Sequence, residues 1–301
     1  GGGRRMNAPA SAPTRPALRY HGGKWRLAPW LLTLMPPHRV YTEPFGGGAS
    51  VLLRKPRAYG EIYNDLDGEV VNVFRMLRDR GAELQRLLEL TPFARAEFRQ
   101  AYEPCGDDPI EQARRTIARS FMGFGSSATG ENSGFRASSS SSRGTTPAHD
   151  WANFAAALPA LIERLRGVVI ENRQAVEIMN HHDAAATLHY CDPPYVHSTR
   201  SQKVRGVVSQ GRASGKAYRH ELDDDGHRQF ADAAHALEGM VIVSGYHSPL
   251  YDALFGRWER FEHAAHADGA RDRVEVVWLN PAASDALHRS RGGLFAEAAA
   301  A

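Results

Sequence analysis

Four consecutive residues, Asp192-Pro193-Pro194-Tyr195, combine the side-chain types in this sequence that are best suited to chemistry. The apolar run Ala186–Cys191 in front of them predicts a strand, so they leave its carboxyl end. The prolines fix φ and hold the Asp192 carboxylate and the Pro193 carbonyl in one relative position. Two such acceptors match the two hydrogens of an exocyclic amino group, and Tyr195 offers a flat face on which a base can stack. The segment predicts a binding site for a base that carries an amino group. The alternative is a proline-rich turn that only leads the chain out of the strand.

A glycine-rich turn, Glu43–Ser50, follows a predicted strand at Val40–Thr42 and leads into a predicted helix at Ala49–Arg54. Three glycines allow a sharp turn and a close approach of a ligand to the backbone. The N–H groups of the following helix would point at that ligand. The turn lacks Gly-Lys-Ser/Thr, so it is not a P-loop. Because Glu43 would repel phosphate, a neutral or cationic nucleoside fits this turn better than a nucleotide.

Asp65 ends a second predicted strand, Tyr59–Asn64, about twenty residues after the glycine turn. In dinucleotide-binding folds a carboxylate at this place accepts hydrogen bonds from ribose hydroxyls. An ordinary turn aspartate in Asn-Asp-Leu-Asp-Gly is an equally good explanation.

Predicted strands and helices alternate in the first and last parts of the chain, and a middle segment lacks this alternation. The alternation predicts an α/β fold with a doubly wound, Rossmann-like sheet. Predicted helices in the middle of the chain flank an irregular stretch, Gly123–Thr146, which predicts an inserted, helical and loop-rich lobe. The predicted helices are Glu69–Arg80, Arg95–Tyr102, Ile110–Phe121, Trp151–Leu165, Ala175–Asn180 and His220–Leu237, and the later strands are Val168–Ile170, Met240–Ser244 and Val274–Leu279.

Taken together and in order, the motifs resemble a known family. They are Tyr20-His21-Gly22-Gly23-Lys24, Glu43-Pro44-Phe45-Gly46-Gly47-Gly48-Ala49-Ser50, Asn64-Asp65-Leu66-Asp67 and Asp192-Pro193-Pro194-Tyr195. This set is similar to the Dam-type (D12 class) DNA adenine-N6 methyltransferases, which include solitary phage and bacterial enzymes. Asp-Pro-Pro-Tyr by itself also occurs in RNA and cytosine-N4 methyltransferases, so the order of the motifs carries the resemblance. The segment Ser244–Tyr251 adds to it.

The resemblance implies S-adenosylmethionine as cofactor. We also expect a catalytic methyltransferase domain at 18–90 and 166–285, an inserted target-recognition lobe at 91–165 and a C-terminal tail at 286–301. Residues 1–17 are rich in Gly, Pro, Ala and Ser, which predicts a disordered lead-in. Asp192 would lie near both the methionine amino group and the target base, and Asn172 or Arg173 would flank the cofactor adenine, where Asp is usual. The cofactor-binding residues carried over are Tyr20, Lys24, Glu43, Phe45, Gly46, Asp65, Asn172 and Asp192.

The mechanism that follows places Asp192 and the Pro193 carbonyl on the two N6 hydrogens of adenine and stacks Tyr195 on the base. A base in a duplex must be flipped out to reach such a pocket, and contacts to phosphate have to offset the cost. The expected DNA contacts are Arg119, Arg136, Arg200, Lys203, Arg205, Arg212, Lys216 and Arg219. For the last six, a solvated surface loop is the alternative. The segment Ser120–Arg136 departs from the run typical of enzymes that act on GATC, so no recognition sequence is assigned.

Composition limits the other possibilities. The 301 residues carry a formal net charge of +3, which favours an anionic partner only weakly. Two distant cysteines, Cys105 and Cys191, exclude a disulfide framework and a four-cysteine zinc site, and no metal is expected. No apolar run reaches the roughly 18–20 residues of a membrane helix.

We expect a cytoplasmic protein that binds double-stranded DNA, is compatible with a monomer, and has any cognate restriction enzyme on another chain. RNA adenine-N6 or DNA cytosine-N4 methylation, or an inactive DNA-binding relative, are the alternatives.

Overall fold

The computed structural model describes residues 12–126, 133–138, 144–194, 222–266 and 272–298. The chain forms two compact units, each assembled from separate stretches of sequence. We call them the helical unit, which comprises Gly1–Trp25, Gly48–Arg54 and Glu69–Gly167, and the sheet unit, which comprises Arg26–Gly47, Lys55–Gly68 and Val168–Ala301. The two units are compact parts of the fold, and they are not defined by function. The boundaries expected for the catalytic domain and the inserted lobe therefore stay a prediction.

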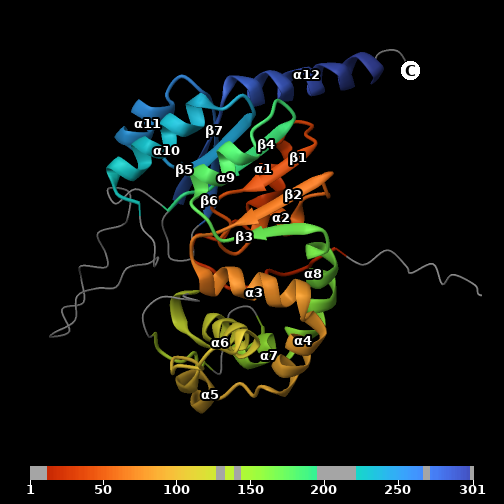
Figure 1. The fold of residues 1–301 in the computed structure, drawn as a ribbon, viewed down its shortest axis with the longest axis vertical. Coiled ribbons are helices and arrows are strands. Elements are labelled where there is room, and N and C mark those ends of the chain that lie inside the picture. The colour runs from red at the N-terminus through yellow and green to blue at the C-terminus, as the bar shows by residue number, and fades with distance from the viewer. Residues whose placement is uncertain (1–11, 127–132, 139–143, 195–221, 267–271, 299–301) are drawn as a thin grey trace, which may run out of the picture. The chain divides into compact units, whose positions relative to one another are not determined.

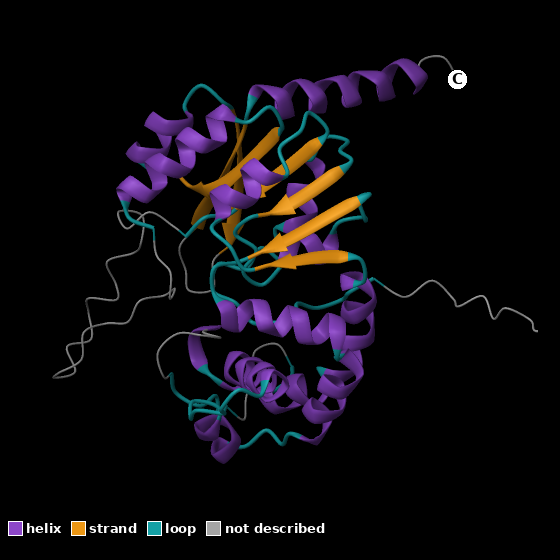
Figure 2. Ribbon diagram, in the orientation of Figure 1, coloured by secondary structure: helices purple, strands orange, loops and turns teal. Residues whose placement is uncertain are grey.

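The sheet unit is built on a seven-stranded sheet of order β3-β2-β1-β4-β5-β7-β6 (Figures 1 and 2). The first five strands in this order run parallel, and β7 and β6 continue the sheet in antiparallel pairing. Strand β1 lies between β2 and β4, so the order of connection reverses there. The predicted doubly wound α/β fold is confirmed. The strands are β1 Val40–Glu43, β2 Gly60–Asn64, β3 Val168–Glu171, β4 Thr187–Cys191, β5 Met240–Tyr246, β6 Glu259–His266 and β7 Asp272–Leu279.

Three helices pack on one face of this sheet: α9 Ala175–His181, α10 Asp224–Ala236 and α11 Pro249–Phe255. Their apolar side chains join those of β4, β5 and β7 in one buried cluster that includes Phe230, Phe255 and Trp278. Side-chain caps set where the helices begin. Asp223 accepts a hydrogen bond from the Gly226 amide at 2.8 Å, and Ser248 accepts one from the Tyr251 amide at 3.1 Å.

The other face and the end of the sheet unit carry α1 Ala28–Thr33 and α12 Pro281–Ala298. In α1, the ring of Trp30 stacks on His263 of β6 with 4.8 Å between the ring centroids. His263 of β6 pairs with Glu275 of β7, so both side chains lie on the same face of the sheet. Glu275 precedes Val276 of the buried cluster, and successive strand residues point to opposite faces. Helix α1 therefore lies on the face opposite the buried cluster.

The helical unit packs its helices around an aromatic core. Phe121 and Phe154 have ring centroids 4.4 Å apart, and the guanidinium of Arg15 lies 5.4 and 5.3 Å from these two rings. Asp108 caps α6 by accepting from the Ile110 amide at 3.1 Å. The helices are α2 Ser50–Arg54, α3 Gly68–Asp79, α4 Gly81–Leu90, α5 Arg95–Gln100, α6 Pro109–Met122, α7 Pro147–Ala152 and α8 Leu158–Leu165, with short 3-10 turns at Phe124–Ser126 and Ala155–Ala157.

Several expected boundaries are corrected by the structure. The single helix expected over Trp151–Leu165 is broken after Ala152, because the first turn of α8 carries Pro159, whose missing N–H fits a helix start and not a helix interior. Helix α10 begins at Asp224 instead of His220, since Asp223 is its cap. Helices α4 and α11 and strand β6 were not expected.

Both ends of the chain also differ from expectation. Arg15 and Ala17, placed in the lead-in, belong to the packed helical unit, and Ala17 is fully buried. The expected tail at 286–301 is helical through Ala298, as part of α12.

Candidate active site

The glycine turn after β1 is packed against the end of β2. The Gly46 amide donates to the Asn64 carbonyl at 2.7 Å, and the Tyr63 hydroxyl donates to the Gly47 carbonyl at 2.8 Å. A Cβ atom on Gly46 would lie 2.3 and 2.6 Å from two ring atoms of Tyr63 and 2.9 Å from the Asn64 carbonyl oxygen. Gly47 has a φ of +46°, in the left-handed region. The turn therefore needs glycine for its own packing, whatever ligand it meets.

Asp65 ties the turn to the end of β2. One carboxylate oxygen accepts from the Gly47 amide at 2.8 Å, and the other accepts from the Asp67 amide at 2.8 Å. Asp65 thus shapes the loop, and its bond to a ribose hydroxyl stays a prediction.

Asn64 is a site residue whose importance the sequence did not reveal. Its fully buried amide donates to the carbonyls of Pro44 and Arg173 at 2.8 and 3.0 Å and accepts from the Arg173 amide at 2.9 Å. It therefore joins the end of β2 to the segments that follow β1 and β3. Its place beside Asp65 in the Asn-Asp motif was the available signal.

Asn172, the candidate for the cofactor adenine, lies beside Asp65. Its amide donates to the carbonyls of Asp65 and Leu66 at 2.8 and 3.1 Å. The alternative candidate, Arg173, directs its guanidinium to Glu177 at 3.0 Å. Of the two, Asn172 is the one held against the loop of Asp65.

Asp192 follows the last residue of β4 and is anchored to the next strand. The Ser244 hydroxyl donates to Asp192 Oδ1 at 2.9 Å, and the Tyr190 hydroxyl lies 3.0 Å from Ser244 Oγ. Cys191 points to the opposite face, where it is buried with its Sγ 4.0 Å from Met179 Sδ, and burial raises the pKa of its thiol. Pro193 is buried and Pro194 half-buried, and Tyr195 lies outside the described residues.

The turn after β1 and the Asp192 segment after β4 leave neighbouring parallel strands at the same end of the sheet. Glu43, almost fully buried, accepts a hydrogen bond from the Tyr41 hydroxyl at 2.7 Å, and burial together with this carboxylate raises the pKa of Tyr41. Phe45 packs edge-on against Phe230 with ring centroids 5.3 Å apart. In open α/β sheets, ligands bind outside the carboxyl ends of the strands where the connection order reverses, which is this place.

Tyr20 and Lys24 belong to the helical unit. They lie in a tight turn in which the Gly23 amide donates to the Tyr20 carbonyl at 3.1 Å and Lys24 Nζ donates to the Gly22 carbonyl at 3.0 Å. Lys24 is only 4% exposed. A Cβ on Gly48 would lie 3.1 Å from Tyr20 Cβ, so the end of the glycine turn packs against Tyr20.

The arginines expected to contact DNA in the inserted lobe are engaged within the helical unit. The Arg119 guanidinium pairs with Glu69, donates to Thr116 at 3.1 Å and lies 5.5 Å from the centroid of Tyr102. Arg136 donates from its side chain to the Phe121 carbonyl at 3.0 Å. The other basic candidates, Arg200, Lys203, Arg205, Arg212, Lys216 and Arg219, lie outside the described residues.

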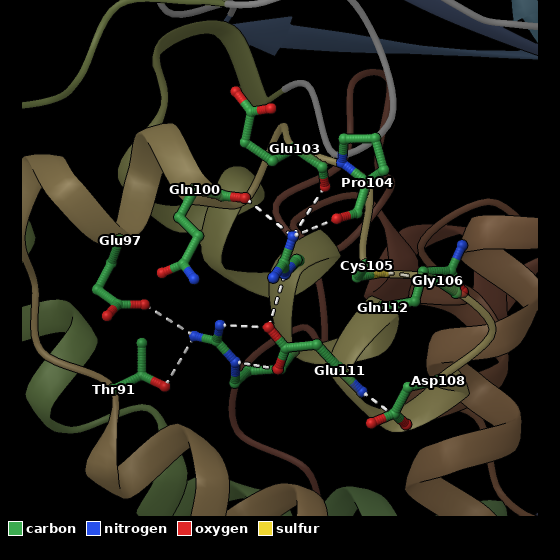
Figure 3. Close-up of polar contacts among 12 residues, drawn as sticks. Thr91, Glu97, Gln100, Glu103, Pro104, Cys105, Gly106, Asp108, Glu111 and Gln112 are labelled. Atoms are coloured by element: carbon green, nitrogen blue, oxygen red, sulfur yellow. Dashed lines mark hydrogen bonds and ion pairs between the residues drawn. The ribbon is translucent and has the colours of Figure 1, made fainter.

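A polar cluster on α6 uses two further arginines in the same way (Figure 3). Arg114 donates to both carboxylate oxygens of Glu111 at 2.7 Å and reaches Glu97 at 3.0 Å, while Arg115 donates to Glu111 at 2.6 Å. Hydrogen bonds from Arg114 and then Arg115 lower the pKa of Glu111 from 4.5 to about 2. This cluster serves the packing of the helical unit.

The model of one protein family, the D12 class N6 adenine-specific DNA methyltransferases, matches residues 20–223. The chain belongs to this family. The match covers more than half of the sequence and includes the candidate residues from Tyr20 to Asp192. This methyltransferase is therefore an enzyme of site-specific DNA adenine methylation, and the resemblance of its ordered motifs is confirmed. No curated protein matches the chain.

Methyltransferases generally take their methyl group from S-adenosylmethionine. In the described part of this methyltransferase, no group of three His, Cys, Asp or Glu side chains could hold a metal ion. None of the described helices combines the length and the apolar character needed to cross a bilayer.

Proposed function

We propose that this methyltransferase transfers the methyl group of S-adenosylmethionine to N6 of an adenine flipped out of duplex DNA. In this proposal the Asp192 carboxylate and the Pro193 carbonyl accept the two N6 hydrogens. The observation that carries it is the placement of Asp192 at the carboxyl end of β4, hydrogen-bonded to Ser244 and next to the strand that ends in the glycine turn. Tyr195 would stack on the base.

The loops after β1 and β2 suit this cofactor. They combine acidic groups, which suit a sulfonium cation, with a close-packed turn in which Gly46 leaves no room for a side chain. When bound, S-adenosylmethionine supplies an electrophilic methyl group. The residues that would hold it are Tyr20, Lys24, Glu43, Phe45, Gly46, Asp65, Asn172 and Asp192.

Because the cofactor supplies the reactive methyl group, the contribution of the protein itself is electrostatic. The lone pair of adenine N6 is delocalised into the ring, so N6 is a poor nucleophile. Acceptors on both N6 hydrogens localise this lone pair and stabilise the positive charge that develops on N6. Holding N6 in line with the methyl group adds a proximity effect. Cys191 takes no part, because its side chain lies on the other face of the sheet.

Duplex DNA is the proposed partner, and a base must leave the stack to reach Asp192. Extrusion costs a few kcal/mol, which contacts to phosphate offset. Since Arg119 is engaged with Glu69, the six basic residues from Arg200 to Arg219 are the main proposed phosphate contacts. The segment 91–165 would recognise the target within a catalytic framework formed by 18–90 and 166–285, in a protein that acts as a monomer in the cytoplasm.

The test is to incubate the protein with unmethylated genomic DNA and labelled S-adenosylmethionine, digest the DNA to nucleosides and identify the labelled base. We expect label in N6-methyladenine, and none with Asp192→Ala. Asp225→Ala, at an exposed position of α10, is the matched control and should keep full activity. Near-normal labelling by a folded Asp192→Ala protein would overturn the proposed role of Asp192.

A further inference from the structure

The side chains of Tyr190, Ser244 and Asp192 form a continuous hydrogen-bonded row on one face of the sheet. Tyr190 and Asp192 are two residues apart, so they point to the same face. Tyr190 pairs with Ile242 of β5, and Ser244 follows Ile242 by two residues, which places Ser244 on that face as well. The opposite face at this point is apolar core, formed in part by Cys191 and Val243.

The direction of the hydrogen bonds in this row can be assigned. An ionised carboxylate only accepts, so the single hydroxyl hydrogen of Ser244 goes to Asp192 Oδ1. The Tyr190 hydroxyl must then donate to Ser244 Oγ, 3.0 Å away. Ser244 and Tyr190 are 1% and 3% exposed, and hydrogen bonds in such a setting strengthen one another.

We propose that Ser244, backed by Tyr190, is a positioning residue for methyl transfer: it fixes the rotation of the Asp192 carboxylate at the angle that faces the N6 amino group. This rests on the proposed role of Asp192. Residues after a strand end have freedom that strand residues lack, and Asp192 is the first residue beyond β4. A bond to β5 removes that freedom before substrate arrives, so the orientation need not be achieved in the transition state.

The test compares the steady-state kinetics of Ser244→Ala with those of the unaltered enzyme, with S-adenosylmethionine and an unmethylated duplex each varied. A hydrogen bond to a charged group corresponds to about a 10- to 100-fold change in rate. We expect kcat to fall by about that factor with both KM values unchanged, the sign of an interaction that acts on the transition state. The matched control is Ser284→Ala, which removes a serine hydroxyl from the Glu259 carboxylate at the start of β6. Its kcat should not change.

Tyr190→Phe distinguishes positioning from general packing. It should lower kcat by about 2- to 10-fold in the unaltered protein. In the Ser244→Ala background it should have no further effect, since Tyr190 acts through Ser244. If Ser244→Ala does not fold, an unchanged kcat for Tyr190→Phe overturns the proposal.

The proposal is also overturned if Ser244→Ala keeps its kcat, if it raises KM instead, or if Ser284→Ala loses as much activity. Asp192→Ala is measured in parallel. If Asp192→Ala is inactive and Ser244→Ala is fully active, only the positioning role fails. If Asp192→Ala is active, the proposed function itself fails.

Discussion

Gly46 shows at the scale of one residue how packing constrains the candidate site. Its missing side chain is what lets the turn after β1 lie against Tyr63 and the backbone of Asn64. Tyr63 is fully buried and cannot swing away, and the Asn64 carbonyl already accepts the Gly46 amide. A methyl group here must displace the turn that carries Phe45.

We predict that Gly46→Ala destabilises the protein by about 1–3 kcal/mol, the usual range for overpacking, and weakens binding of S-adenosylmethionine. Urea unfolding and isothermal titration would measure the two effects. Gly292→Ala is the control, because a Cβ there meets nothing within 4 Å and glycine is unfavourable inside a helix. It should leave stability equal or slightly higher. An unchanged unfolding midpoint for Gly46→Ala would show that the turn is not held as described.

At the scale of elements, Arg114 links α6 to its neighbours, and Glu111 is the carboxylate on the same helix that holds it. Glu111 accepts from Arg114 and Arg115 on the same helix, and Arg114 also reaches Thr91 and Glu97. The Glu111 side chain is 25% exposed, so its ion pairs are less exposed to solvent than ordinary ion pairs on a protein surface. The hydrogen bonds from Arg114 lower the pKa of Glu111 to about 2.

A pKa that is lower in the folded than in the unfolded chain means that the unfolded chain binds the proton more tightly. The stabilisation by Glu111 is therefore complete above about pH 4.5 and is lost as the pH falls toward 2. We predict that Glu111→Gln lowers the free energy of unfolding by about 2 kcal/mol at pH 7 and that the difference shrinks as the pH falls through this range. Denaturant unfolding across pH measures it. Glu83→Gln, in the half-exposed pair with Arg80, should lower stability much less than Glu111→Gln does, because solvent screens an exposed ion pair. An equal effect of both variants at pH 7 would contradict the argument.

At the scale of the whole molecule, charge is nearly balanced, with 37 Lys and Arg against 34 Asp and Glu. A net charge of +3 is too small to bind DNA by itself. Binding must rely on local clusters of basic residues, and Arg114, Arg115 and Arg119 are engaged with carboxylates in the helical unit. The basic residues from Arg200 to Arg219 form another group in the sequence, with no acidic residue among them.

We predict that replacing Arg205 and Arg212 together by Ala weakens DNA binding and flattens its dependence on salt. The slope of log K against log salt should fall by about 0.9 for each phosphate that the variant no longer neutralises. Fluorescence anisotropy at several salt concentrations measures this slope. Arg228→Ala with Arg257→Ala removes the same charge from α10 and from the turn before β6, and should leave the slope unchanged. If both double variants shift the slope equally, net charge and not the local cluster binds the phosphates.

The family and the fold class could be predicted from the sequence because their signals are local. The Asp-Pro-Pro-Tyr segment, the glycine turn and the alternation of strands with helices depend on residue type and short spacing. β6 escaped prediction because Glu259–His266 mixes charged residues with alanine, and its strand conformation comes from pairing with β7.

Only the tertiary structure decided which side chains act together at the candidate site. Ser244 meets Asp192 across 52 positions of sequence, and Asn64 binds Arg173 across 109. Such contacts follow from the order of strands in the sheet, which brings β4 beside β5 and β2 beside β3. The same holds for Arg119, which looks like a surface cation in the sequence until folding places Glu69 beside it. Residue type sets what chemistry is available, and the sheet order determines which groups are close enough to carry it out.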